Sequence, residues 1–284
     1  MDIIFYGVRG SIPAPGSETF RYGGNTVCVQ VTLADGTILI LDAGSGMRAC
    51  GRALLEKQFK MPLNILHTHA HWDHLMGIPF FAPLYQRETW VRTWPMATPG
   101  QREAQRKRVM FDSNHFPVRA DDLPARFENM NDDAPVWHIG SAQVRRIALN
   151  HPGGAQGFRL DDEDGRSLAF LTDNELSPPG PVQTSMDELA RFSASVDVLI
   201  HDSQYVAADL PAKHGWGHSI VPDVLQLAKM AEARHVVLFH HDPERSDDAL
   251  DAIGATVRRW VDAHAPDLIA TMAYEGLVLR PGAG

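Results

Sequence analysis

The residue types most able to do chemistry gather in one window of this chain, where four of its fourteen histidines fall within eight residues. The window contains the string THAHWDH (68–74), which follows an apolar run that we expect to be a strand. Side chains two residues apart in extended backbone lie on one face, so His69 and His71 can bind one metal ion together. Asp73 and His74 come where the chain turns toward a helix and can face a neighbouring position. The spacing therefore predicts a loop that serves two metal ions.

The ligand types indicate which metal ions the loop would bind and what kind of site it forms. Imidazole and carboxylate groups bind zinc at about 2.0 to 2.2 Å and also suit manganese or iron. We therefore predict two divalent ions, with zinc as the first expectation. A structural zinc site is closed and usually contains thiolates, but Cys28 and Cys50 lack metal-ligand spacing. An open, catalytic site is expected, with His67 as a strand-end residue outside it.

The remaining ligands are expected just past the ends of other strands, where a sheet presents its loops. Three residues meet this condition: His151, which precedes two glycines that permit close backbone approach, Asp173 and His240. His241 follows directly, so the sequence leaves open which of these two histidines is the ligand. Asp42, also at a strand end, is either the partner of a ligand histidine or a plain turn residue.

Apolar runs rich in β-branched residues predict strands in two series, and helices alternate with the second series. Ser246 can cap a helix that has acidic residues in its first turn and one apolar stripe. This order predicts an α/β fold with helix, sheet, sheet and helix layers, in a single domain over 1–284. The strands are expected at 3–6, 27–33, 37–41, 63–66, 144–149, 168–172, 196–200, 236–239, 268–270 and 277–279, and the helices at about 222–234 and 246–261.

The segment at about 85–131 fits this pattern less well, because it combines prolines, aromatic residues and a basic run (102–108) without clean strand periodicity. We expect it to be an inserted cap. Its Phe111, His115 and Phe116 can either close over the metals and stack on a ring of the substrate, or pack in the core. The basic run is either a phosphate patch or a solvated helix face.

Several motifs, taken together, resemble a known family. THAHWDH (68–74) is typical of the metallo-β-lactamase superfamily, which the chain resembles across essentially its whole length. The resemblance implies a four-layer αββα sandwich of two mixed sheets with helices outside. Within the superfamily, the branch with cyclic phosphodiesterases and the tRNA 3′-processing ribonuclease Z is similar at GVRGSIP (7–13), RYGGNT (21–26), LDAG (41–44), NHPGG (150–154), TDNE (172–175) and GHS (217–219).

The resemblance also implies a ligand set and a nucleophile. A hydroxide shared by two metal ions would attack the substrate, since two cations about 3.5 to 4 Å apart lower the pKa of bound water and stabilise the entering and leaving oxygens. True β-lactamases of the superfamily lack a bridging carboxylate at the position of Asp173, which counts against antibiotic hydrolysis. We count Asp73 among the catalytic residues as well as the ligands. The implied ligands are His69, His71 and His151 for one ion, Asp73, His74 and His240 for the other, and Asp173 for both.

In the phosphodiesterase branch an acidic residue and a histidine assist the leaving group, and Asp202 and His218 match those places. We expect His218 to donate a proton and Asp202 to orient it. The alternatives are that His218 shapes a helix start and that Asp202 has no such role, because ribonuclease Z-like members carry a longer acid there. Arg9, Asn25 and, from the cap, His115 are the predicted substrate contacts, although Arg9 and Asn25 could instead brace loops.

The acidic composition narrows the choice of substrate. A formal net charge of −9 should repel a polyanion unless metal ions or a basic patch reverse the local field. We also see no long Gly-rich or basic insertion of the kind that ribonuclease Z-like enzymes use to hold tRNA. We therefore predict a phosphodiesterase for cyclic nucleotides or related small cyclic phosphodiesters and do not expect long nucleic acid as a partner. The alternatives are a carboxylic ester, thioester or lactone hydrolase, a ribonuclease Z-like RNA 3′-end endonuclease, and a non-catalytic metal-binding scaffold.

Location and assembly are inferred from what the sequence lacks and from the family. The first residues do not form the charged and apolar regions of a signal peptide, and no apolar run approaches the roughly 18 to 20 residues that cross a bilayer. With two cysteines and no disulfide framework, we expect a cytoplasmic protein without membrane contact. Branch relatives often form dimers whose partner helps wall the site, so the resemblance implies a homodimer.

Overall fold

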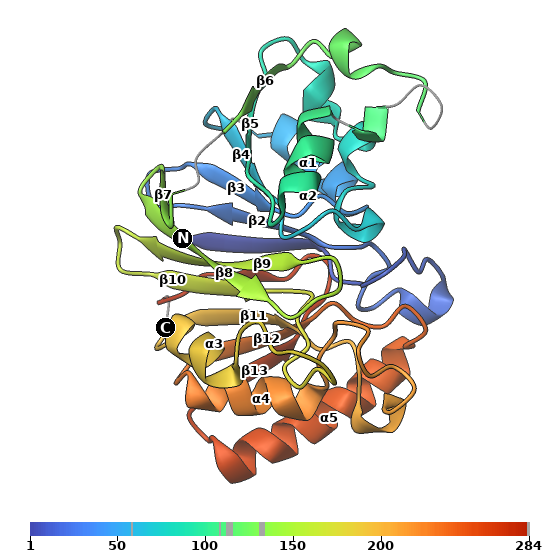
Figure 1. The fold of residues 1–284 in the computed structure, drawn as a ribbon, viewed down its shortest axis with the longest axis vertical. Helices are drawn as coiled ribbons and strands as arrows, with labels where there is room; N and C mark the ends of the chain where they lie inside the picture. The colour runs from blue at the N-terminus through green and yellow to red at the C-terminus, as the bar shows by residue number, and fades with distance from the viewer. Residues whose placement is uncertain (58, 108, 112–115, 131–133, 283–284) are drawn as a thin grey trace.

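A computed structural model describes residues 1–57, 59–107, 109–111, 116–130 and 134–282. Over these residues the chain folds into two mixed sheets of seven strands each, with helices on both outer sides (Figure 1). The predicted order of helix, sheet, sheet and helix layers is confirmed. In the same ranges, none of the helices is both long and apolar enough to cross a membrane.

The first sheet is built mainly from the N-terminal half of the chain. Its strands run antiparallel from β14 to β3 and parallel from β3 to β6, in the order β14-β1-β2-β3-β4-β5-β6. Parallel pairing of β3 with β4 places the carboxyl ends of these two strands at the same edge. The bounds are Asp2–Gly7 (β1), Cys28–Thr32 (β2), Ile38–Leu41 (β3), Leu63–Leu66 (β4), Trp90–Trp94 (β5), Arg126–Asn129 (β6) and Val278–Leu279 (β14).

The second sheet is built from the C-terminal half and has the order β13-β12-β11-β10-β9-β8-β7. Strands β10 to β13 are parallel, whereas β7, β8, β9 and β10 pair antiparallel. The parallel part again brings several carboxyl ends to one edge. The bounds are Val136–Ile139 (β7), Ala142–Leu149 (β8), Ala155–Asp162 (β9), Ser167–Leu171 (β10), Val198–Asp202 (β11), His235–Phe239 (β12) and Ile269–Met272 (β13).

Helices cover the outer face of each sheet (Figure 1). The predicted cap at Ser246 is confirmed, because its hydroxyl accepts a hydrogen bond from the amide of Ala249 at 3.2 Å. The helices are Met47–Leu55 (α1) and Pro99–Lys107 (α2) on the first sheet, and Met186–Phe192 (α3), Val221–Met230 (α4) and Asp247–His264 (α5) on the second. Short 3-10 turns lie at Ser17–Thr19 (η1), Trp72–His74 (η2), Ile78–Phe80 (η3), Ala82–Tyr85 (η4), Val109–Phe111 (η5), Ala120–Asp122 (η6) and Ala207–Asp209 (η7).

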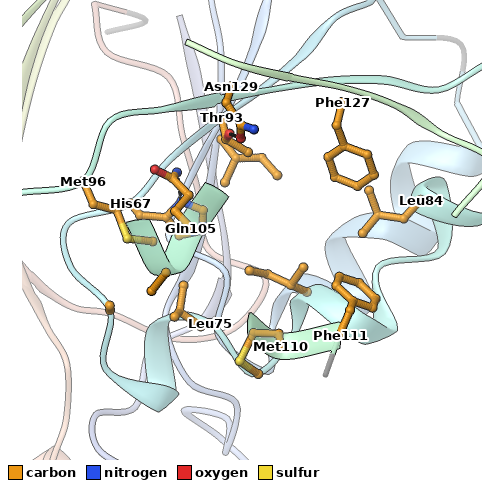
Figure 2. A pocket seen from close by; sticks show the side chains of 14 residues that line it. His67, Leu75, Leu84, Thr93, Met96, Gln105, Met110, Phe111, Phe127 and Asn129 are labelled. Atoms are coloured by element: carbon orange, nitrogen blue, oxygen red, sulfur yellow. Dashed lines mark hydrogen bonds between the residues drawn. The ribbon is translucent and has the colours of Figure 1, made fainter. Parts of the chain in front are cut away.

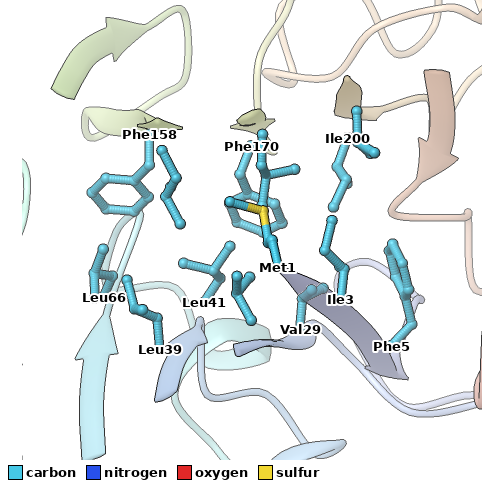
Figure 3. Packing of buried hydrophobic residues seen from close by; sticks show 14 of the residues in the cluster. Met1, Ile3, Phe5, Val29, Leu39, Leu41, Leu66, Phe158, Phe170 and Ile200 are labelled. Carbon is cyan, nitrogen blue, oxygen red and sulfur yellow. The ribbon is translucent and has the colours of Figure 1, made fainter. Parts of the chain in front are cut away.

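The main core lies between the two sheets. Phe158, Phe170 and Ile200 of the second sheet face apolar side chains of the first, among them Leu66 and Leu41 (Figure 3). All five are fully buried. Since each strand presents alternate residues to this layer, the apolar faces hold the two sheets together and fix which loops meet at the edge.

The segment predicted to be an inserted cap, about 85–131, is in part a component of the first sheet. It supplies β5 and β6, which pair in parallel beside β4, and α2 with η5 lies outside them. The prediction missed β6 because its side chains, RFEN, are long, polar or aromatic and not buried, and it missed β5 because only Val91 and Trp94 of its five residues are buried. A strand at a sheet edge need not alternate apolar and polar residues cleanly.

Removal of the Phe158 ring tests the role of the core between the sheets. We expect Phe158→Ala to lower the free energy of unfolding by about 3 to 5 kcal/mol, because the ring is fully buried and leaves a cavity. Ile269→Ala, on the edge strand β13 where the side chain is 59% exposed, should change it by less than about 0.5 kcal/mol. Urea unfolding followed by circular dichroism measures both. Equal losses would show that this layer is not the main core.

Candidate metal centre

The predicted ligands come together where strands of both sheets end. His69, His71, Asp73 and His74 follow β4 in the first sheet, whereas His151, Asp173 and His240 follow β8, β10 and β12 in the second. The backbone turns sharply there, with φ of 58° at Asp42, 61° at Asp173 and 60° at His240. Non-glycine residues seldom adopt this left-handed conformation, and it persists where the surrounding structure enforces it. The chain thus accepts local strain to aim these side chains.

Four side chains form the first group of candidate ligands. The ligand atoms of His69, His71, His151 and Asp173 all lie within 4.8 Å of one another. Nε2 of His151 is 3.1 Å from Nδ1 of His71. Oδ2 of Asp173 is 3.5 Å from Nε2 of His69 and 3.6 Å from Nε2 of His151.

A second group lies beside the first and shares Asp173. Asp73, His74 and His240 are its other members, and all four side chains are buried. Oδ1 of Asp173 is 3.3 Å from Nε2 of His74 and 3.0 Å from Nε2 of His240. Asp173 therefore presents one carboxylate oxygen to each group, as a bridging ligand must.

The geometry fits metal ions, by two observations. Ligand atoms about 2.1 Å from a tetrahedral ion are about 3.4 Å apart, and the distances from the Asp173 oxygens to the four histidines His69, His151, His74 and His240 run from 3.0 to 3.6 Å. Nε2 of His69 and Nε2 of His74 are also buried without a hydrogen-bond partner among the described residues. Buried polar atoms without partners are costly, so the donor set is suited to cations.

The second ring nitrogen of four of the histidines is held by an oxygen atom. Nδ1 of His74 is 2.9 Å from Asp42, and Nδ1 of His69 is 3.0 Å from the hydroxyl of Thr68, which itself donates to Asp42. Nδ1 of His240 is 2.8 Å from Oε1 of Gln204. An oxygen acceptor places the proton on Nδ1 and leaves the Nε2 lone pair free for a metal ion. Asp42 is thus a partner of candidate ligand histidines and not a plain turn residue.

His151 depends on a glycine loop for its orientation. Its Nδ1 is 3.0 Å from the carbonyl of Gly217, and a Cβ atom at Gly217 would lie 2.2 Å from the same Nδ1. Gly217 has a φ of +89°, and its amide donates to Glu175 at 2.9 Å. Glu175 also accepts from the amide of Gly215 and is almost fully buried. The buried Glu175 carboxylate therefore holds this loop in place.

The charges of the centre are coupled. Burial raises the pKa of the Asp173 carboxyl, but the neighbouring imidazoles, that of His240 foremost, hold it well below its usual range. Burial likewise raises the pKa of Asp73, but the imidazoles of His74 and His240 together hold it well below its usual range. Burial is the largest cause that lowers the pKa of His69. Burial also lowers the pKa of His74, but Asp173, Asp73 and Asp42 together raise it well above its usual value. Because metal ions bind the deprotonated imidazole, an ion bound there would take the place of that proton.

His218 and Asp202 meet beside the ligand groups, as predicted. Nδ1 of His218 is 3.0 Å from Oδ2 of the fully buried Asp202, and the ring stacks on His240 with centroids 5.0 Å apart. Burial lowers the pKa of His218, but Asp202, with smaller contributions from Asp173 and Asp73, raises it to about 9. His218 lines an open hollow together with Ser11, His71, Trp72, Asp73 and Asp173.

Two predicted substrate contacts do not fit their positions. The guanidinium of Arg9 is fully buried and donates to the backbone carbonyls of Gly23, Asp242 and Arg245. The amide of Asn25 is also occupied, since Nδ2 donates to Glu275 and Oδ1 accepts from Ser45. Both residues brace the loop between β1 and β2, which favours the alternative that they support loops over contact with a substrate phosphate.

Three other histidines can be placed or set aside. His115 lies outside the described residues. His241 is buried with Nε2 2.9 Å from the carbonyl of Ala273, so His240, and not His241, joins the ligand groups. His67 is buried outside both groups, as expected, and burial lowers its pKa to about 4.

Sequence reasoning missed the groups that hold the ligands. Gln204, the hydroxyl of Thr68 and the amide of Ser11, which donates to Asp73 at 2.7 Å, were not predicted. Thr68 stands in the histidine window and could have been weighed as a partner. Gln204 and Ser11 carry no signal of spacing, because their contacts span 36 and 62 residues.

Comparisons with known proteins agree with this arrangement. A family model described as "Beta-lactamase superfamily domain" matches residues 37–241. Ribonuclease Z of Shouchella clausii (strain KSM-K16) is 23% identical and covers 84% of this chain and 86% of its own length. Among solved structures, the metallo-β-lactamase fold protein YhfI from Bacillus subtilis superimposes with a TM-score of 0.68 at 15% identity, covering 98% of both chains. A diphosphatase of the PhnP family gives 0.67 at 19% identity over 98% and 97%.

A methyl group at Gly217 tests whether the loop positions His151. We expect Gly217→Ala to weaken metal binding by about 10- to 100-fold, because the added Cβ would displace the ring. Gly276→Ala is the matched control, since its φ is +88° and nothing lies near its Cβ. Competition with a chromogenic zinc chelator measures affinity, and thermal unfolding checks that both variants lose similar stability. Equal metal affinity in the two variants would show that Gly217 has no part in the site.

Proposed function

The chain belongs to the β-lactamase superfamily, and on that premise we propose that it is a binuclear metal-dependent phosphodiesterase that acts on small cyclic phosphodiesters such as cyclic nucleotides. The resemblance predicted from the motifs is thereby confirmed at the level of the family. Metal-dependent hydrolysis of phosphoric diesters is supported by the similarity to the relative named ribonuclease Z and to the diphosphatase of the PhnP family. The single observation that carries the proposal is the Asp173 carboxylate, which faces both ligand groups.

We propose that the two ligand groups hold two divalent cations. His69, His71 and His151 would bind one, Asp73, His74 and His240 the other, and Asp173 both. Nitrogen and oxygen donors without thiolate suit zinc, and also manganese or iron. Bound there, the cations would lower the pKa of a water molecule and offset the negative charge of a phosphodiester.

The proton for the leaving group would come from His218. Asp202 accepts from Nδ1 of this imidazole, so Nε2 is the atom that can face the hollow. Because Asp202 is buried and also accepts from the amides of Asn174 and Gln204, it holds one orientation. His218 would thus donate its proton to the departing oxygen while Asp202 stabilises the imidazolium before transfer. Asp202 acts in this scheme as a positioning residue.

The hollow over the ligand groups favours a small substrate with a ring. Trp72 lies between two candidate ligands, His71 and Asp73, and is 61% exposed, which is unusual for so large an apolar side chain. A nucleobase could stack on the indole while the phosphodiester meets the ligand groups. We infer cyclic nucleotides over longer substrates from this stacking and from the net charge of −9, which would repel a polyanion.

A ribonuclease Z-like activity is the second candidate. The relative named ribonuclease Z spans most of this chain, which weighs against the expectation that long nucleic acid is not a partner. Against RNA stands the acidic balance of the chain. A carboxylic ester, thioester or lactone hydrolase is a third candidate, since a pair of cations also polarises a carbonyl group.

An assay with counted metals tests the proposed function. We expect the purified protein to hold two divalent ions per chain and to hydrolyse bis(p-nitrophenyl) phosphate and at least one cyclic nucleotide, with Asp73→Ala losing one ion and the turnover. Mass spectrometry counts the metals. Two ions without phosphodiester cleavage would contradict the proposal in favour of ester or thioester hydrolysis. A salt-sensitive gel shift with tRNA, together with cleavage at its 3′ end, would favour the nuclease.

Substrates with different leaving groups test the role of His218. We expect His218→Asn to slow hydrolysis of a cyclic nucleotide by about 10² to 10⁴-fold, since its alkoxide needs a proton, but that of a p-nitrophenyl ester by less than about tenfold. Asp202→Asn should show the same pattern to a smaller degree. Steady-state kinetics at matched metal content gives both ratios. An equal decrease on both substrates would assign His218 a structural role.

A further inference from the structure

A separate cavity lies on the outer face of the first sheet, beneath α2 and η5 (Figure 2). Its volume is about 130 Å³. Most of its wall is apolar, formed on one side by Leu84, Phe111 and Phe127 and below by Leu75 and Met110 (Figure 2). None of the described residues that line it bears a carboxylate, an ammonium or a guanidinium group.

One side of the cavity is polar, where His67, Gln105, Thr93 and Asn129 lie together (Figure 2). His67 is 2% exposed, and its Nε2 has no hydrogen-bond partner among the described residues. Nε2 of Gln105 donates to the carbonyl of Trp94 at 3.0 Å and lies 3.5 Å from Nδ1 of His67. Since an amide nitrogen can only donate, Nδ1 of His67 is the acceptor of this pair, and Nε2 of the neutral ring carries the proton.

We propose that this cavity binds a compact, uncharged ring compound that carries one oxygen able to accept a hydrogen bond from His67. Its volume is close to that of a cavity of 150 Å³ known to bind benzene. A charged ligand would be buried without a counter-ion, which is strongly unfavourable. The N–H of His67 has almost no accessible surface, so the ligand oxygen would reach it through a small shift of the cavity wall, and the buried donor would then gain the partner that it requires.

The cavity is distinct from the hollow over the ligand groups. The two share no lining residue among those described. The wall includes Ala70 and Leu75, which stand within and just after the loop that carries His69, His71, Asp73 and His74. A ligand in the cavity would therefore contact the back of that loop without reaching the groups that face the substrate.

A pair of ligands of equal size tests the proposal on the metal-loaded full chain. Phenol and toluene have the same number of heavy atoms, but only phenol can accept from His67. We expect saturation-transfer NMR to show that both bind, that benzoate does not, and that inorganic phosphate displaces neither. Displacement of phenol by phosphate would overturn the separation from the metal centre, and absence of phenol binding would overturn the site.

Two variants and one control locate the binding. Ala104→Leu, on the α2 wall, should fill the space and abolish binding of both compounds, whereas Ala49→Leu, exposed on α1, should leave it unchanged. His67→Phe keeps the ring but removes the donor, so phenol should lose about fivefold relative to toluene. Metal content and thermal unfolding confirm that each variant is intact, and Ala104→Leu alone suffices if His67→Phe does not fold. Phenol binding that survives Ala104→Leu, or an unchanged phenol-to-toluene ratio in His67→Phe, would overturn the proposal.

Discussion

The arrangement of the centre depends on one buried carboxylate that must face two groups of imidazoles at once. Burial of Asp173 opposes its ionised form, and only the surrounding histidines outweigh that opposition. Those histidines come from β4 and β12, in different sheets. The two sheets must therefore pack in one relative position for the ionised carboxylate to be stable. The fully buried apolar layer between the sheets fixes that position (Figure 3).

A layer of oxygen acceptors lies around the candidate ligands and sets the face that each ring presents. Asp42 ties the end of β3 to the loop after β4, directly through His74 and indirectly through Thr68 and His69. Gln204 does the same for His240. Because these hydrogen bonds fix the orientation of the rings, little reorganisation would be needed when an ion binds. Strained backbone at Asp42, Asp173 and His240 is the cost of that preorganisation.

The sequence predicts most of the fold and the candidate ligands because both follow from patterns among residues that are close together in the chain. Periodic apolar runs mark β1, β4, β10 and β12, and the crowding of polar residues just past such runs marks His151, Asp173 and His240. Arg9 and Asn25 show where local signals end, since a loop arginine that binds phosphate and one that braces carbonyl groups look the same. The residues they contact, such as Asp242 and Glu275, lie more than 200 positions away. Strands β5 and β6 were missed for a similar reason: only their neighbours in the sheet make them strands.

The spread of the ligand groups along the chain has a consequence for folding. His69 follows β4 in the first sheet, and His240 follows β12 in the second. The ligand groups therefore form only when the two sheets have packed together. An ion held there would act as a cross-link between the two halves of the sandwich. It would bind the native chain and not the unfolded one, and so raise the free energy of unfolding by mass action. Availability of the metal in the cell would then set how long each molecule survives proteolysis as well as whether it turns over substrate.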